Sequence, residues 1–165
     1  MSDKAKPRAR TAARVAAVQA LFQSEQAQAN PETVIDEFVR HRLGADALGQ
    51  QTDGFEEGRV PDAHVPLFGR IVRSAVREQD RIDSLLAEVL PADWPLGRLD
   101  PVLRALLRAG CAEFTMADGP PTRVVINEYL DVAHGFFTGE EPRMVNGVLD
   151  RMARHLRPRD FPANP

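Results

Sequence analysis

Residues 123–156 carry the pattern that decides the fold, and they read RVVINEYLDVAHGFFTGEEPRMVNGVLDRMARHL. Apolar residues recur there every three or four positions, which is the spacing of one buried face of an α-helix. The first half predicts a helix with an apolar face of Val124, Val125, Ile126, Tyr129, Leu130, Ala133 and Phe136. The second half predicts a helix that begins near Glu140, ends before Pro158 and buries Val145, Val148, Leu149, Met152 and Leu156.

The same spacing continues toward the N-terminus. Gly119-Pro120-Pro121 separates residues 123–156 from a leucine-rich helix that starts at Asp100-Pro101, a capping residue followed by a proline. Gly110 lies inside that helix, where glycine costs about 1 kcal/mol relative to alanine. We therefore expect a close contact with another helix at this position.

The N-terminal half is also helical in its pattern. Apolar residues from Val65 to Val89 keep a helical period, with Asp62 as a candidate cap, and a helix of that length is expected to be bent. Asn30-Pro31-Glu32 predicts another helix start, and the segment before it buries Val15, Val18, Leu21 and Phe22. No segment alternates with the period of a strand, so the sequence predicts an all-α protein.

The chain is expected to form two helical subdomains. Residues 1–10 are predicted to be a basic flexible arm, and residues 11–90 an N-terminal subdomain with a mobile, glycine-rich loop at 44–61. Residues 91–157 form the predicted C-terminal subdomain, and residues 158–165 a tail. The interruption at 91–97 is interpreted as the hinge, and Trp94 within it as a packing residue.

Composition and motifs argue against an enzyme. No apolar run reaches the roughly 18 residues that span a bilayer, no signal peptide is recognisable, and Cys111 is the only cysteine, so we expect a cytoplasmic protein. The sequence contains no zinc-protease motif, phosphate-binding glycine loop or nucleophile elbow. Glu113 and Glu128 are interpreted as ion-pair or cap partners. The histidines, which are scattered, are His41, His64, His134 and His155. We expect no catalytic residue, no metal and no cofactor.

Positive charge gathers at the N-terminus although the net charge is −3. Residues 1–14 contain Lys4, Lys6, Arg8, Arg10 and Arg14 against Asp3 alone. Arg10 and Arg14 are four positions apart and so lie on one side of a helix. A basic arm of this kind is typical of RNA-binding segments, and charge alone is equally compatible with a solvated tail.

Four elements of the sequence resemble those of the NusB family and occur in the same order. Residues 14–22, RVAAVQALF, resemble R-x-x-A-V-Q-A-L-Y, and Leu107-Arg108 with Glu113-Phe114 resembles L-R-x-x-x-x-E-L. Residues 123–133, RVVINEYLDVA, resemble V-A-I-N-E-A-x-E-L-A, and residues 143–150, RMVNGVLD, resemble F-V-N-G-V-L-D. Residues 24–98 resemble the family only in their helical pattern.

The resemblance implies a bundle of about seven helices, in which two packed three-helix subdomains share the seventh. It implies binding of boxA, a single-stranded element of ribosomal RNA leader transcripts, as a heterodimer with NusE, a protein of the small ribosomal subunit. The complex would load onto RNA polymerase and suppress termination. A homodimer remains open.

The resemblance also implies which residues contact RNA. The basic start of the first helix would contact phosphates and bases. The start of the last helix would also contact RNA, and there the family has a basic residue that is usually followed by Phe. Near it lies an acidic position that tunes RNA affinity. The predicted RNA-binding residues are Lys6, Arg8, Arg10, Arg14, Glu140, Arg143 and Met144. Asn127 and Asn146 are interpreted as satisfying backbone groups where the subdomains meet.

Three positions depart from the family pattern. Thr11 and Ala12 stand where relatives often have arginine, and Met144 offers a softer surface than Phe for base stacking. These departures predict weaker RNA binding and a greater dependence on the partner. Two alternatives remain: a self-associating helical bundle, and a general RNA-binding module related to the N-terminal domain of ribosomal RNA cytosine methyltransferases, which has the same bundle fold.

Overall fold

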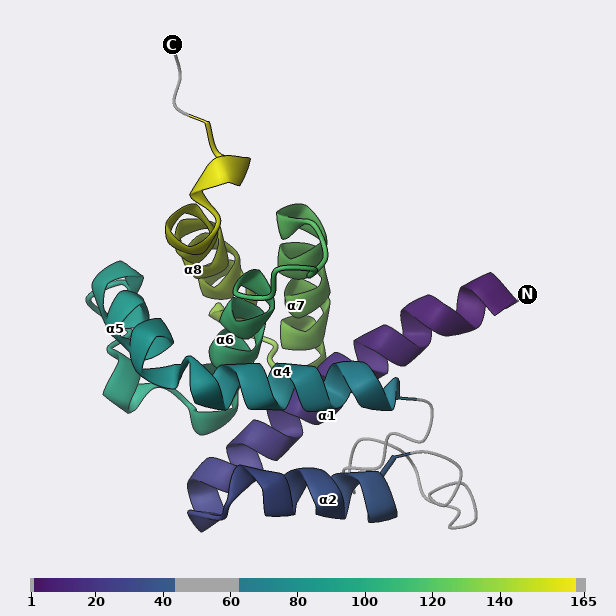
Figure 1. Cartoon of the computed structure of the whole chain (residues 1–165). Helices are drawn as coiled ribbons and strands as arrows, with labels where there is room; N and C mark the ends of the chain where they lie inside the picture. Colours follow the sequence, from purple (N-terminus) through teal and green to yellow (C-terminus); the bar gives the residue numbers. More distant parts are fainter. Residues whose placement is uncertain (1, 44–62, 163–165) are drawn as a thin grey trace. The chain divides into compact units, whose positions relative to one another are not determined.

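The computed structural model describes residues 2–43 and 63–162, with side chains from residue 9 onward. The predicted loop at 44–61 lies outside the described residues. The described chain forms seven α-helices, two short 3-10 helices and no strand, which confirms the predicted all-α class (Figure 1). The α-helices are α1 (Ser2–Ala27), α2 (Pro31–His41), α4 (Val65–Arg77), α5 (Gln79–Val89), α6 (Pro101–Phe114), α7 (Thr122–Phe136) and α8 (Glu141–Leu156). The 3-10 helices are η2 (Leu96–Arg98) and η3 (Pro158–Asp160). No helix in the described ranges is both long and apolar enough to cross a membrane.

The chain packs as two compact units, Met1–Arg73 and Ser74–Pro165, so that the division falls inside α4. The subdomain limits expected at residues 90 and 91 stay a prediction. Residues 2–10, expected to form an arm, continue α1 as helix.

In the first unit, a capped helix, α2, packs against α4 through an aromatic pair. Asn30 caps this helix by accepting a hydrogen bond of 2.8 Å from the Glu32 amide, with Pro31 in the first turn, as its sequence predicts. The α2 ring of Phe38 is fully buried and stacks on Phe68 of α4 at a centroid distance of 5.6 Å. The aromatic pair therefore fixes α2 against the first part of α4.

Helix α1 is buried nearly all round over one stretch. Residues 13–18 are six consecutive buried positions, and Ala13, Ala16 and Ala17 have no exposed surface. Since consecutive residues on a helix point in directions about 100° apart, such a run means that the helix is covered on every side.

The second unit is centred on α6. Asp100 accepts hydrogen bonds from the amides of Val102 and Leu103, which confirms the predicted helix start. A Cβ atom on Gly110 would lie 3.1 Å from Leu149 of α8 and 3.4 Å from Tyr129 of α7. The helices pack so closely there that only glycine fits without movement, which is the close contact predicted for this position.

The single long helix predicted through residue 90 is wrong, because α4 and α5 are separate helices that meet at Glu78. The sequence could not reveal this break. Ala75 and Ile82, buried on either side of it, are seven positions apart, so the helical period runs through the junction unchanged. Arg108 of α6 then ties α5 in place through two hydrogen bonds to Asp83, of 2.9 and 2.8 Å.

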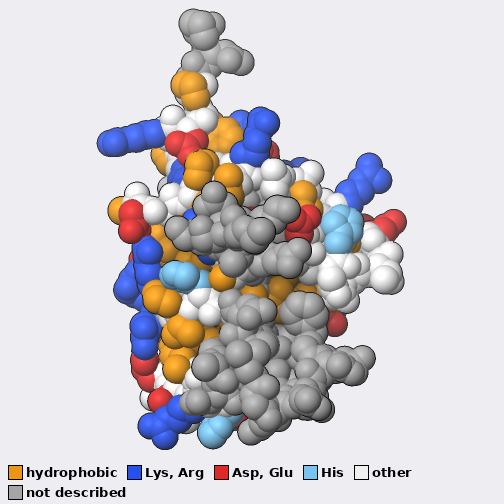
Figure 2. All heavy atoms as spheres, turned by 90° about the vertical axis from the view of Figure 1, so that its right-hand side faces the viewer, with side chains coloured by type: hydrophobic (Ala, Val, Ile, Leu, Met, Phe, Trp, Pro, Cys, Tyr) orange, Lys and Arg blue, Asp and Glu red, His pale blue; other side chains and the backbone are white. Residues whose placement is uncertain are grey.

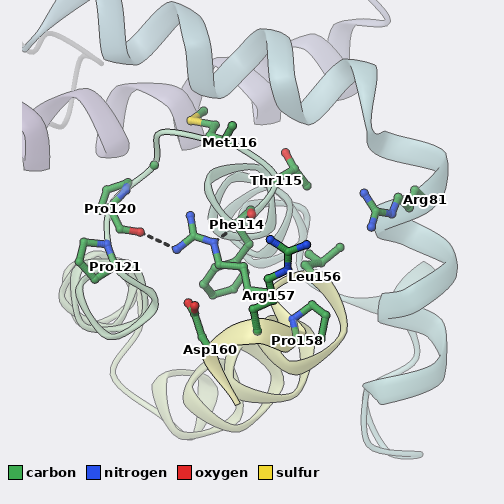
Figure 3. A pocket seen from close by; sticks show the side chains of 13 residues that line it. Arg81, Phe114, Thr115, Met116, Pro120, Pro121, Leu156, Arg157, Pro158 and Asp160 are labelled. Carbon is green, nitrogen blue, oxygen red and sulfur yellow. Dashed lines mark hydrogen bonds between the residues drawn. The ribbon is translucent and has the colours of Figure 1, made fainter. Parts of the chain in front are cut away.

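Arg157, directly after α8, links the C-terminal end of the second unit to α6 and to the segment that follows α6 (Figure 3). Its guanidinium donates to three backbone carbonyls: Phe114 at 3.0 Å, Glu113 at 2.9 Å and Pro120 at 2.5 Å. The same group lies 5.5 Å from the centroid of the Phe114 ring. Figure 3 shows the side chain in a pocket of about 590 Å³, with its dashed bond toward Pro120. The end of α6 and the chain after α8 are thereby joined.

Candidate nucleic-acid interface

The basic residues predicted on α1 have different environments. Arg10 is exposed, whereas Arg14 is buried with only 2% of its surface accessible. Lys6 and Arg8 lie on α1, but their side chains are outside the described part. Burial of a guanidinium group requires hydrogen-bonding partners within the fold. Arg10 can therefore meet a phosphate directly, while Arg14 holds a position within the packed part of the helix.

The predicted residues at the start of α8 also divide by exposure. Glu140 and Arg143 are exposed, and Glu140 precedes the first residue of the helix. Met144 is only 9% exposed and belongs to the buried stripe that continues with Val145 and Val148. The side chain of Met144, predicted to offer a surface for base stacking, is therefore not accessible to a base.

Sequence reasoning missed an exposed aromatic residue next to this segment. Phe136, the last residue of α7, was placed on a buried helix face, yet 37% of its surface is accessible. Its ring lies 6.3 Å from that of Phe137, at an interplanar angle of 49°. Val124, placed on the same predicted face, is 42% exposed. The apolar pattern of α7 is wider than the face that the helix buries, so spacing alone could not distinguish these two.

The interpretation of Asn127 and Asn146 as internal hydrogen-bonding residues is wrong. Both are exposed, and no hydrogen bond joins either side chain to another residue within the described chain. They line a polar hollow of about 500 Å³ together with Arg123, Asp150 and Phe161. Residues from the two most family-like elements thus share one surface of the second unit.

Glu113 and His64 both form hydrogen bonds within the fold. Glu113 has no exposed surface and accepts a hydrogen bond of 2.6 Å from the Tyr129 hydroxyl. His64 accepts a bond from the Leu67 amide at the start of α4. Among the described residues, no group of three or more His, Cys, Asp or Glu side chains is placed to hold a metal.

Cys111 is buried, as predicted, with no accessible surface. Burial raises the pKa of its thiol well above the ordinary value, and the nearby Asp83 charge raises it further. Because the thiolate is the nucleophilic form, this cysteine is chemically inert at neutral pH.

Charge on the surface is mixed. Among the side chains coloured by type in Figure 2, Lys and Arg side chains lie interspersed with acidic ones. This agrees with the net charge of −3.

Comparison with known proteins places the chain among named relatives. The sequence profile described as the NusB family matches residues 11–154. A protein named transcription antitermination protein NusB, from Granulibacter bethesdensis, is 71% identical over 154 residues, which cover 93% of each chain. Among solved structures, NusB of T. maritima has a TM-score of 0.69 at 26% identity, over 91% of this chain and 94% of that one. The crystal structure of antitermination factors NusB and NusE in complex with dsRNA has a TM-score of 0.67 at 22% identity, over 88% of this chain and 96% of that one. At this identity the likeness shows the fold alone.

Proposed function

This chain belongs to the NusB family, and from that membership we propose that it acts as a transcription antitermination factor. It binds boxA-type single-stranded RNA in ribosomal RNA leader transcripts together with NusE, and the complex suppresses termination by RNA polymerase. The observation that carries the proposal is the 71% identity, over 93% of both chains, to a protein named for antitermination. The protein works in the cytoplasm by binding and not by catalysis.

RNA contacts are proposed for residues of both units. Arg10 on α1 and Arg143 on α8 are exposed cations that can neutralise phosphates, and Lys6 and Arg8 extend the charge of α1. Glu140 is an exposed carboxylate near Arg143, so it weakens RNA binding by repulsion. Arg14 and Met144 are buried, so they support RNA binding indirectly, by holding α1 and α8 in the conformation that exposes the other residues.

The main test is RNA binding by the full chain with and without NusE. We expect the two proteins together to bind boxA-type RNA more tightly than either protein alone, because the family partner adds its own contacts. Fluorescence anisotropy of a labelled boxA-type RNA measures both affinities. A scrambled RNA of the same length is the control for sequence, and Arg40→Ala, an exposed arginine of α2 outside the proposed contacts, is the control for charge. Equal binding of the scrambled RNA would refute the specific function.

The two arginines of α1 are expected to respond differently to replacement by alanine. Arg10→Ala should weaken RNA binding and flatten the log–log salt dependence by about 0.7 for each phosphate that the variant no longer neutralises. Arg14→Ala should leave that slope unchanged and lower the free energy of unfolding by about 1 kcal/mol or more, because a buried side chain and its packing are removed.

Titrations at several salt concentrations and urea denaturation of both variants measure these effects. A salt slope that falls for Arg14→Ala would show that this side chain reaches the backbone of the RNA after all. A slope that stays constant for Arg10→Ala would remove Arg10 from the proposed contacts.

A further inference from the structure

We propose that one base of the bound RNA enters the polar hollow lined by α7, α8 and the segment after α8, where the side-chain amides of Asn127 and Asn146 recognise its edge. The hollow has a volume of about 500 Å³. The inference rests on the proposed function and deepens it, because it assigns the preference for boxA-type RNA to particular side chains.

Three polar side chains that line the hollow have no partner within the described chain. Asn127 of α7 and Asn146 of α8 are exposed, and neither amide forms a hydrogen bond there. Arg123, four positions before Asn127, is also exposed and forms neither a hydrogen bond nor an ion pair with the described residues. A single exposed amide is ordinarily hydrated, but here two helices bring two amides and a guanidinium group to one hollow. Each amide offers an acceptor oxygen and two N–H donors to a ligand.

The walls of the hollow, in contrast, are held by contacts within the fold. The Thr122 hydroxyl donates to the Asp160 carboxylate at 2.7 Å, which joins α7 to η3. The Arg154 guanidinium lies 4.5 Å from the centroid of the Phe161 ring and pairs with Asp150 at 3.1 Å. The two carboxylates and the ring that line the hollow therefore have defined positions before a ligand arrives.

The chemistry of the hollow fits a base better than a phosphate. The carboxylates of Asp150 and Asp160 repel a phosphate, whereas a base carries no charge. An amide places an acceptor and a donor side by side, and this pair matches the donor and acceptor on the edge of a base. Phosphate contacts by Arg10 and Arg143 position an RNA strand but do not distinguish one sequence from another. Bases of single-stranded RNA are recognised along their edges, so the unpaired amides supply the kind of contact that a sequence preference requires.

The position of the hollow along α8 favours RNA over a protein partner. Asn146 comes three positions after Arg143, a proposed phosphate contact, so the two side chains are neighbours on the helix surface, with Cβ atoms about 5–6 Å apart. Gly147 is exposed, and a Cβ atom there would meet nothing within 4 Å apart from its chain neighbours and the nearby helix backbone. Glycine is unfavourable inside a helix, and no packing within the described chain requires it here. The missing side chain lets a strand that contacts Arg143 pass close to the backbone of α8 on its way to the hollow.

Two variants of the full chain, Asn127→Leu and Asn146→Leu, test the inference with NusE present. Fluorescence anisotropy should show the affinity for boxA-type RNA reduced about fivefold or more, which corresponds to about 1 kcal/mol, with scrambled RNA bound as before. The salt slope should stay constant, because every phosphate keeps its cation. Alanine at either position, which removes the amide without adding apolar surface, should give the same result.

The matched control is Gln79→Leu, which removes a half-buried amide of α5 outside the hollow and should change neither affinity. Because Asn127 and Asn146 are exposed, the thermal unfolding midpoint of their variants should equal that of the unmodified protein.

A series of boxA-type RNAs, each with one base replaced, identifies the base in the hollow. At one position the loss of affinity caused by Asn146→Leu and the loss caused by the replacement should not add, since both remove the same contact. Additive losses at every position would overturn the inference, and so would equal weakening for boxA-type and scrambled RNA, or no weakening at all. Weaker binding of NusE by the leucine variants, with RNA binding retained, would overturn it in favour of a protein contact. If the unmodified protein itself does not distinguish the two RNAs, the proposed function is refuted instead.

Discussion

Replacing Arg157 with alanine is expected to lower the free energy of unfolding by about 3 kcal/mol. The side chain donates to three carbonyl oxygens, of Glu113, Phe114 and Pro120, in a half-buried position. Hydrogen bonds from a charged donor contribute about 1.5–3 kcal/mol each, and they are not additive when they share one group. The change would leave carbonyls at the end of α6 without these donors and would release the chain after α8 from them.

Urea denaturation followed by circular dichroism measures this effect. The matched control is Arg154→Ala, which removes an exposed arginine of α8 that pairs with Asp150 at 3.1 Å; its expected cost is below about 1 kcal/mol. Arg157→Lys should recover little stability, because one ammonium group cannot replace the forked guanidinium across three carbonyls. Equal stability of the alanine variants at 157 and 154 would contradict the role given to Arg157.

Tyr129→Phe is expected to lower the free energy of unfolding by about 2 kcal/mol, the second largest effect. The change removes a single hydroxyl, which donates to Glu113 at 2.6 Å where both side chains have no exposed surface. The cost arises because the buried carboxyl group loses a donor that water cannot replace.

A double-mutant cycle with Glu113→Leu measures how strongly the two side chains are coupled. The double variant should be less destabilised than the sum of the two single variants, because replacing both partners by apolar groups leaves no orphaned polar atom between them. Simple additivity of the two losses would mean that the hydrogen bond is not what stabilises this part of the core.

The fold was predictable wherever a local rule governs the backbone. Asn30 and Asp100 cap the predicted helices, because a side-chain oxygen followed by proline favours the start of a helix. The start of α4 is different. There His64 accepts the bond from Leu67, and histidine is not among the residues that normally mark a cap. Asp62, the predicted cap, lies outside the described residues.

The candidate site was predictable only in part, because helical spacing gives the direction of a side chain and not what covers it. Arg10 and Arg14 were correctly predicted to lie on the same helix, but the alanine-rich run around Arg14 allows close packing that buries it. For Met144 a signal did exist. Its spacing to Val145, Val148 and Met152 matches the buried stripe of α8, and that pattern predicts burial more directly than the family resemblance predicts exposure.

The inert thiol of Cys111 has a practical consequence for fluorescence work on this protein. Because it is the chain's only cysteine and is fully buried, maleimide dyes should leave the native protein unlabelled. A cysteine introduced at Gly135 would then be the only reactive thiol, in a position where a Cβ atom meets no atom within 4 Å apart from its own chain neighbours and the nearby backbone of the helix. A dye attached there would mark the end of α7 without any need for a cysteine-free background.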